Sequence, residues 1–277
     1  MTAQSDQSSN ARPGTGESCE RAVATFRFHA ELNDFLAREQ RHREIVYRCA
    51  RAATVKNAIE ALGVPHTEVD VILVNGEPGD LSRPVRDGDR VAVYPREGVD
   101  VHSLRRSRDL PLLDARFVAD AHLGGLARLL RMLGFDTVFA NDIPDEHIAA
   151  LAAEDGRVVL TRDRALLKRR GIVRGCYLHA LRPQDQLREV VQRFGLAAYA
   201  RPFTRCLHCN LPLHAIEKRG IVDRLPPKVA ALHERFQTCD GCRRIFWEGS
   251  HWTRMREMLA TLLHRRPCAG DDQFSPP

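Results

Sequence analysis

The chain has 277 residues, of which 43% are hydrophobic, and a formal charge of +6. That length exceeds the usual size of one domain, so we expect two or three domains, and the apolar content excludes a wholly disordered chain. No apolar run approaches the length of a membrane span, and residues 1–20 are polar rather than a signal peptide. The composition favours a soluble, cytoplasmic protein with a disordered segment at residues 1–20.

The positive charge is concentrated near the C-terminus, where residues 201–277 contain thirteen Lys and Arg against eight Asp and Glu. This bias suits a polyanionic partner such as nucleic acid, because cationic side chains neutralise phosphates. It is equally compatible with ordinary solubility.

Residues 21–100 alternate in a pattern typical of a small α+β domain. Strands are expected at residues 23–29 and 44–49, a helix capped by Thr54 follows, and strands at 69–74 and 90–94 complete the domain. The predicted order is therefore two strands, one helix and two strands.

This order resembles the β-grasp sulfur-carrier and ubiquitin-like proteins, on the segments Val74-Asn-Gly76 and Asp87-Gly-Asp-Arg-Val-Ala-Val-Tyr-Pro95. Such carriers act through a C-terminal Gly-Gly, but this chain continues through Glu97 without one. The resemblance implies an adaptor with a protein partner rather than a sulfur carrier, and a structural appendage is the alternative. Residues 101–112 are predicted to be a linker, so we expect a chain beginning near Leu110 to fold alone.

Residues 113–200 repeat a unit of strand, carboxylate and helix. The apolar residues 117–119 lead to Asp120, and apolar positions then recur at helical spacing as far as Gly134. Two further strands end at Asp142 and Asp163, and a fourth is expected at residues 175–178. The pattern predicts an α/β domain with a parallel sheet.

Asp120, Asp142 and Asp163 follow three strands, and ligand sites in parallel sheets lie beyond the carboxyl ends of the strands. Carboxylates that converge there would bind Mg²⁺ or Mn²⁺, which prefer oxygen ligands and can activate water for attack on a phosphodiester. The alternative is that each aspartate caps the following helix, a role compatible with metal binding.

Basic side chains near these carboxylates are candidates for substrate binding, since they could contact a phosphate backbone. A solvated cationic helix face is the alternative explanation. The candidates are Arg128, Arg131, Arg162, Arg164 and Lys168.

The segments Phe117-Val-Ala-Asp120, Leu129-Leu-Arg-Met-Leu-Gly-Phe-Asp136 and Leu160-Thr-Arg-Asp163 resemble the PIN-like ribonuclease family of the mutator-seven C-terminal type. The resemblance covers roughly residues 114–260 and implies metal-dependent RNA cleavage with Asp120, Asp142 and Asp163 as the acidic residues. The same family carries a ubiquitin-like domain in its bacterial members.

The C-terminal segment contains two Cys-x-x-Cys pairs, Cys206 with Cys209 and Cys239 with Cys242. Paired knuckles of this kind form tetrahedral zinc sites, and a helix at residues 227–236 could connect them. Free thiols and a redox pair are the alternatives. We therefore expect a zinc ribbon at residues 201–260 and a flexible tail at 261–277.

These observations predict a β-grasp domain, a PIN-like domain and a zinc ribbon. The function that fits them is an Mg/Mn-dependent ribonuclease whose zinc ribbon aids RNA binding. The alternatives are a non-catalytic RNA- or ribosome-binding adaptor and, less compatible with the missing Gly-Gly, a sulfur-transfer accessory protein.

Overall fold

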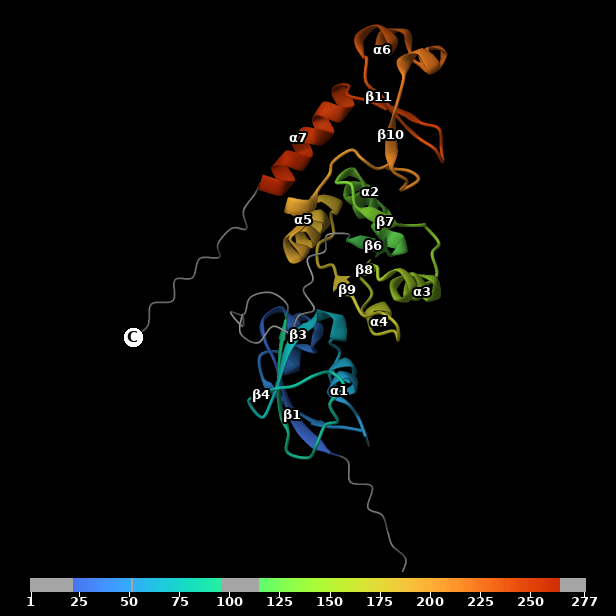
Figure 1. The fold of residues 1–277 in the computed structure, drawn as a ribbon. Coiled ribbons are helices and arrows are strands. Elements are labelled where there is room, and N and C mark those ends of the chain that lie inside the picture. The colour runs from blue at the N-terminus through green and yellow to red at the C-terminus, as the bar shows by residue number, and fades with distance from the viewer. Residues whose placement is uncertain (1–21, 51, 96–114, 265–277) are drawn as a thin grey trace, which may run out of the picture.

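The computed structural model describes residues 22–50, 52–95 and 115–264. The strands of these residues form three sheets of five, four and three strands. Figure 1 shows them following one another in chain order, with the four-stranded sheet between the other two. No helix in this part of the chain is long and apolar enough to cross a membrane. The predicted linker at residues 101–112 and the segment 1–20 lie outside the described residues, as does the predicted tail beyond residue 264.

The N-terminal domain has a β-grasp fold, as predicted. Its strand order is β2-β1-β5-β3-β4, and helix α1 packs against the sheet through Val55, Ala58 and Ile59. Thr54 caps α1 by accepting a hydrogen bond from the Asn57 amide. The elements are β1 Val23–Phe28, β2 Glu44–Arg48, α1 Val55–Ala61, β3 Val69–Val74, β4 Glu77–Pro78 and β5 Arg90–Pro95.

The central domain has a parallel sheet in the order β7-β6-β8-β9, which confirms the predicted α/β class. Successive side chains of β6 point to opposite faces: Phe117 packs with α2 and α5, whereas Val118 packs with α3 and α4. The elements are β6 Arg116–Ala119, α2 Gly124–Met132, β7 Asp136–Val138, α3 Asp145–Asp155, β8 Val158–Thr161, α4 Arg164–Leu167, β9 Gly175–Tyr177 and α5 Pro183–Phe194.

The C-terminal ribbon is an antiparallel sheet in the order β10-β11-β12. The helix expected at residues 227–236 ends at Leu232, because residues 236–239 form the central strand of this sheet instead. The elements are β10 Leu213–Ile216, α6 Pro227–Leu232, β11 Phe236–Cys239, β12 Ile245–Trp247 and α7 Ser250–His264.

Helix α7 returns from the ribbon to the central domain, and Figure 1 shows it leading from the ribbon toward α5. Leu259 and Leu262 are buried in the core formed by α2 and α5. The helix therefore extends beyond residue 260, where the sequence placed the start of a flexible tail, because its apolar side chains complete this core.

The β-grasp domain covers one edge of the central sheet. Edge strand β9 has an outward amide at Tyr177, which donates a hydrogen bond of 2.8 Å to the Glu68 carboxylate. Glu68 lies in the short 3-10 helix η3 (His66–Glu68) and also pairs with Arg193 at 2.6 Å. Gly175 permits this close approach, since a Cβ there would lie 3.3 Å from Thr67.

The ribbon covers the opposite edge in the same manner. Strand β7 presents the amide of Thr137, which donates a hydrogen bond of 3.0 Å to the Asn210 side chain. Gly134 adopts a positive φ of 93°, and a Cβ there would lie 2.3 Å from the Arg201 carbonyl oxygen. At each edge strand of the central sheet, an outward backbone amide therefore donates a hydrogen bond to a side chain of a neighbouring domain.

Candidate functional site

Asp120 and Asp163 lie at the carboxyl ends of two adjacent parallel strands. Ala119 of β6 pairs with Leu160 of β8, and the Asp120 amide continues the ladder by donating to the Leu160 carbonyl at 3.0 Å. Because parallel strands have their carboxyl ends on the same side of a sheet, the fold brings these two carboxylates together at that side, which we call the carboxyl edge.

Thr161 connects the two aspartates. Its hydroxyl donates a hydrogen bond of 2.6 Å to Oδ2 of Asp120 and accepts one of 2.8 Å from the Asp163 amide. Thr161 is fully buried, so no water competes for these bonds. Thr161 was not among the residues expected from the sequence, although its hydroxyl stands at the end of an otherwise apolar strand.

Both aspartates also cap the helices that follow them. Oδ1 of Asp120 accepts a hydrogen bond of 2.6 Å from the Ala121 amide, and Oδ1 of Asp163 accepts one of 2.7 Å from the Ala165 amide. Carboxylate oxygens have about four lone-pair sites, so capping leaves acceptor capacity on each group.

Asp142 has a different environment. It is exposed in the turn after β7, and Pro144 occupies the N-cap position of α3, so Asp142 does not cap that helix. Among residues 22–50, 52–95 and 115–264, the four cysteines are the group whose metal-ligating atoms gather closely enough to bind an ion. The three aspartates are not among such groups, and their convergence on one ion stays a prediction.

The predicted substrate-binding side chains fall into two sets. Arg128 and Arg162 are exposed, and Arg162 lies at the carboxyl edge, where its Nε donates to the Leu178 carbonyl at 3.3 Å. The other three cations donate hydrogen bonds to backbone carbonyls of a neighbouring domain. Arg131 donates to Leu207 and His208, Arg164 donates to Asp34 and Phe35, and Lys168 donates to Glu60.

The four cysteines of the ribbon gather at one point, with their sulfur atoms within 4.8 Å of one another. The Sγ atoms of Cys206 and Cys242 are 3.7 Å apart. A tetrahedral zinc ion with Zn–S bonds of about 2.3 Å would separate its sulfur ligands by roughly 3.8 Å. The arrangement is therefore compatible with zinc, whereas Cys49 and Cys176 are buried in other domains.

The thiols of this cluster influence one another's ionisation. A hydrogen bond with Cys242, together with burial, raises the pKa of the Cys209 thiol to about 12. Burial opposes ionisation of Cys242, but the Arg244 amide and the neighbouring thiols outweigh it and lower the pKa of Cys242 to about 7. Ionisation of Cys206, Cys209 and Cys242 is therefore linked, and a bound cation would favour their thiolate forms.

Comparison with known proteins assigns the family. Residues 115–259, more than half of the chain, match the Mut7-C RNAse domain. The chain belongs to the Mut7-C RNAse domain family. Residues 21–99 match the Mut7-C ubiquitin domain, which confirms the second resemblance found in the sequence.

Comparison also finds one human protein and two archaeal crystal structures. The human protein is described as exonuclease mut-7 homolog and is 33% identical over 122 residues, which are 42% of this chain and 14% of the human protein. This chain therefore spans only a small part of that relative. Small archaeal modifier protein 1 of Haloferax volcanii matches in two crystal structures, at 22% and 21% identity and TM-scores of 0.22 and 0.23. These matches cover 27% and 28% of this chain, and 97% and 98% of the archaeal chains.

Proposed function

We propose that this Mut7-C protein is a metal-dependent ribonuclease whose catalytic residues are Asp120, Asp163 and Asp142. The observation that supports the proposal most directly is the hydrogen-bonded arrangement of Asp120, Thr161 and Asp163 at the carboxyl edge of the family's sheet. The description of the matching family, Mut7-C RNAse domain, supports RNA as the substrate class.

The donor atoms fit a hard divalent cation. Mg²⁺ prefers oxygen ligands, retains several waters and is usually bound by only one or two carboxylates together with substrate phosphates. Asp120 and Asp163 would supply those carboxylates, and the exposed Asp142 is proposed as a third from the next strand. Such an ion, or Mn²⁺ in its place, would polarise the phosphodiester and lower the pKa of an attacking water.

The side chains around the carboxylates have separate tasks in this proposal. Thr161 orients Asp120, because its hydroxyl proton occupies one lone pair of Oδ2. A carboxylate that is not fully occupied by the ion would accept the proton of the attacking water. Arg162 and Arg128 are the exposed cations proposed to contact the phosphate backbone, since Arg131, Arg164 and Lys168 are already engaged between domains.

The ribbon contributes in a different way. We propose that Cys206, Cys209, Cys239 and Cys242 bind a structural zinc ion that folds the ribbon and allows it to bind RNA. The β-grasp domain would act as an adaptor for a protein partner. The domain boundaries proposed are 21–100, 113–200 and 201–260.

A non-catalytic RNA- or ribosome-binding adaptor is the second candidate. It is favoured by one observation: the three aspartates do not form a single group of metal ligands in the described part of the chain. Both candidates need the same fold and the same basic surface, so a catalytic assay has to distinguish them.

The decisive experiment is cleavage of mixed RNA and DNA substrates with added Mn²⁺ or Mg²⁺. Asparagine at position 163 or 120 retains shape and capping ability but removes one negative charge. Asp163→Asn and Asp120→Asn should therefore lower the cleavage rate by roughly two or more orders of magnitude while the fold is retained. Glu154→Gln is a matched control, because Glu154 is an exposed carboxylate on α3 of the same domain.

Unchanged cleavage in both variants, or equally fast cleavage in excess chelator, would reject the ribonuclease mechanism. RNA binding without any cleavage in the wild type would favour the adaptor instead.

A further inference from the structure

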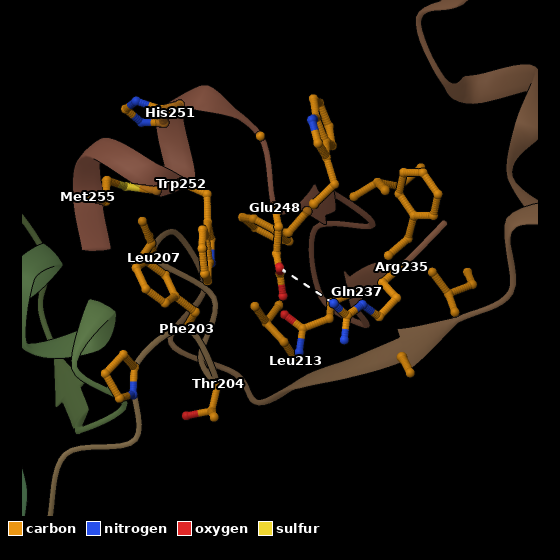
Figure 2. A pocket seen from close by; sticks show the side chains of 18 of the residues that line it. Phe203, Thr204, Leu207, Leu213, Arg235, Gln237, Glu248, His251, Trp252 and Met255 are labelled. Atoms are coloured by element: carbon orange, nitrogen blue, oxygen red, sulfur yellow. Dashed lines mark ion pairs between the residues drawn. The ribbon is translucent and has the colours of Figure 1, made fainter. Parts of the chain in front are cut away.

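A cavity of about 860 Å³ lies between the ribbon sheet and the beginning of α7. Figure 2 shows Trp252 and Met255 of α7 on one side, with Phe203 and Leu207 below them, and Leu213, Gln237 and Arg235 of the ribbon on the other. This volume falls within the range of sites that bind small organic groups. The proposed ribonuclease site does not use the cavity.

Aromatic rings supply much of its wall, namely those of Phe203, Phe236, Phe246, Trp247 and Trp252. The rings of Phe203 and Trp252 lie 5.1 Å apart between centroids, and the Arg256 guanidinium lies 4.8 Å from the Trp252 ring centre. Trp247 and Trp252 are only partly buried although both are large and apolar. The cavity thus offers planar aromatic surface with a cation beside it.

The charge around the cavity favours an anionic ligand. Each carboxylate of its wall lies against a cation: Glu217 against Arg219, Glu234 against Lys218 at 2.5 Å, and Glu248 against Arg235 at 3.9 Å. Residues 201–264 contain eleven Lys and Arg against six Asp and Glu, a formal charge of +5. The surplus next to the cavity comes from Arg205, which lines it, and Arg256, which lies over the Trp252 ring.

We propose that this cavity binds unpaired bases of single-stranded RNA, with bases against the tryptophan rings and phosphates near Arg205 and Arg256. Every base has a flat π-face, so aromatic stacking combined with a cationic surface recognises single strands with little sequence preference. The substrate class rests on the proposed ribonuclease function, but the site itself is separate from the aspartates.

The position of the cavity assigns it a binding role. The ribbon contacts Gly134 and Asp136, at the start of β7, whereas Asp120 and Asp163 follow the opposite ends of β6 and β8. A strand held in the cavity would be retained by the protein without touching the reacting atoms. Loss of the cavity should therefore raise KM and leave kcat nearly unchanged.

Tryptophan fluorescence provides a direct test, because the chain has two tryptophans and both line the cavity. Unstructured oligouridylate would be titrated into the full chain carrying Asp163→Asn, without added divalent metal. We expect quenching that saturates, weaker binding of a duplex of equal length, and a loss of affinity of roughly tenfold or more for Trp252→Leu. Arg256→Gln should also weaken binding, whereas Arg38→Gln removes one charge from the β-grasp domain and should not.

Trp252→Phe keeps an aromatic ring at this position and should retain most of the affinity. This variant, with zinc content and thermal midpoint measured for both substitutions, separates lost stacking from lost folding. Absence of quenching, equal affinity for duplex and single strand, or equal affinity of Trp252→Leu and the parent would overturn the proposal.

Binding and cleavage measurements distinguish the cavity from the ribonuclease site. Saturable quenching in a protein that never cleaves RNA would support the cavity and reject the ribonuclease mechanism. Cleavage with unchanged KM in Trp252→Leu would reject the cavity and leave the aspartates in place.

Discussion

At the scale of single residues, hydrogen bonds of the buried Thr161 side chain organise the candidate site. Thr161 holds Asp120 and Asp163 together through two short bonds. A second polar group lies at the other end of the sheet, where Asp136 accepts hydrogen bonds of 2.8 Å from both Arg157 and Asn210. One group orients the candidate catalytic residues, and the other joins the ribbon to the sheet.

Thr161→Val tests the first group. Valine has nearly the same shape but no hydroxyl, so Asp120 loses a donor and the Asp163 amide loses an acceptor. We expect the free energy of unfolding to fall by about 1–3 kcal/mol and RNA cleavage to decrease, measured by urea denaturation and by the Mn²⁺-dependent assay. Thr161→Ser keeps the hydroxyl and should retain most of the activity; equal activity in valine and serine variants would contradict the orienting role.

The pKa of Asp136 provides a pH-dependent test of the second group. Burial alone would raise it, but hydrogen bonds from Arg157 and Asn210 and the charges of Arg157 and Arg205 hold it below 3.8. A carboxyl whose pKa is lowered by folding stabilises the folded state at any pH above its ordinary pKa. This contribution is lost as the pH falls through the folded-state pKa.

Asp136→Asn should therefore lower the free energy of unfolding at pH 7 by about 1–3 kcal/mol. Near pH 3 the difference from the wild type should become smaller, because the Asp136 carboxyl of the unfolded chain, which has its ordinary pKa, is then largely protonated. Urea denaturation at both pH values measures the two differences. A difference that is constant with pH would show that the Asp136 charge does not stabilise the fold.

At the scale of elements, helix α7 links the cysteine cluster of the ribbon to the core of the central domain. The cysteine cluster holds the ribbon strands, and α7 then carries Leu259 and Leu262 into the core of the central domain. The folding of a small metal site depends on its ion, because the binding free energy of the ion becomes folding free energy. Substitution of the cysteines should therefore also lower the stability of the central domain.

We expect the purified protein to contain about one equivalent of zinc. The double variant Cys209→Ser, Cys242→Ser should lose it, unfold the ribbon and lower the thermal midpoint of the central domain. Elemental analysis and circular dichroism measure these effects. Serine at Cys19 and Cys268, which lie outside the described residues, removes the same number of thiols as a control; retention of zinc in the cluster variant would reject the zinc assignment.

At the scale of the whole molecule, the outer domains complete the central sheet. Glu68 from the β-grasp domain and Asn210 from the ribbon each accept a hydrogen bond from an edge-strand amide. An uncovered edge can pair with another chain, so both domains protect the sheet from aggregation. The sequence-based expectation that a chain beginning near Leu110 folds alone did not take this contact into account.

Glu68→Ala tests the contact in the full-length chain. The Tyr177 amide would lose its acceptor and the nearly buried Arg193 would lose its ion pair. We expect a loss of about 2–4 kcal/mol in the free energy of unfolding, seen in urea denaturation. Glu39→Ala changes an exposed carboxylate of the same domain and should have little effect. Equal stability of the two variants would show that the domains are energetically independent.

The sequence by itself determined the local elements and the family. Period-two spacing placed β3 at its observed ends, helical spacing ended α2 close to Gly134, and the spacing of the four ribbon cysteines indicated that they would cluster. These features depend on neighbours along the chain or on a short repeated motif, so they can be recognised without a three-dimensional structure.

Only the tertiary structure decided which side chains meet across domains. Arg164 resembled a phosphate-binding residue in the sequence, but its guanidinium binds backbone carbonyls 129 and 130 residues away. Likewise, the repeated pattern of strand and carboxylate did not reveal that the Thr161 hydroxyl joins Asp120 to Asp163. Such contacts depend on strand order and domain docking, which bring distant segments together through interactions that local periodicity does not encode.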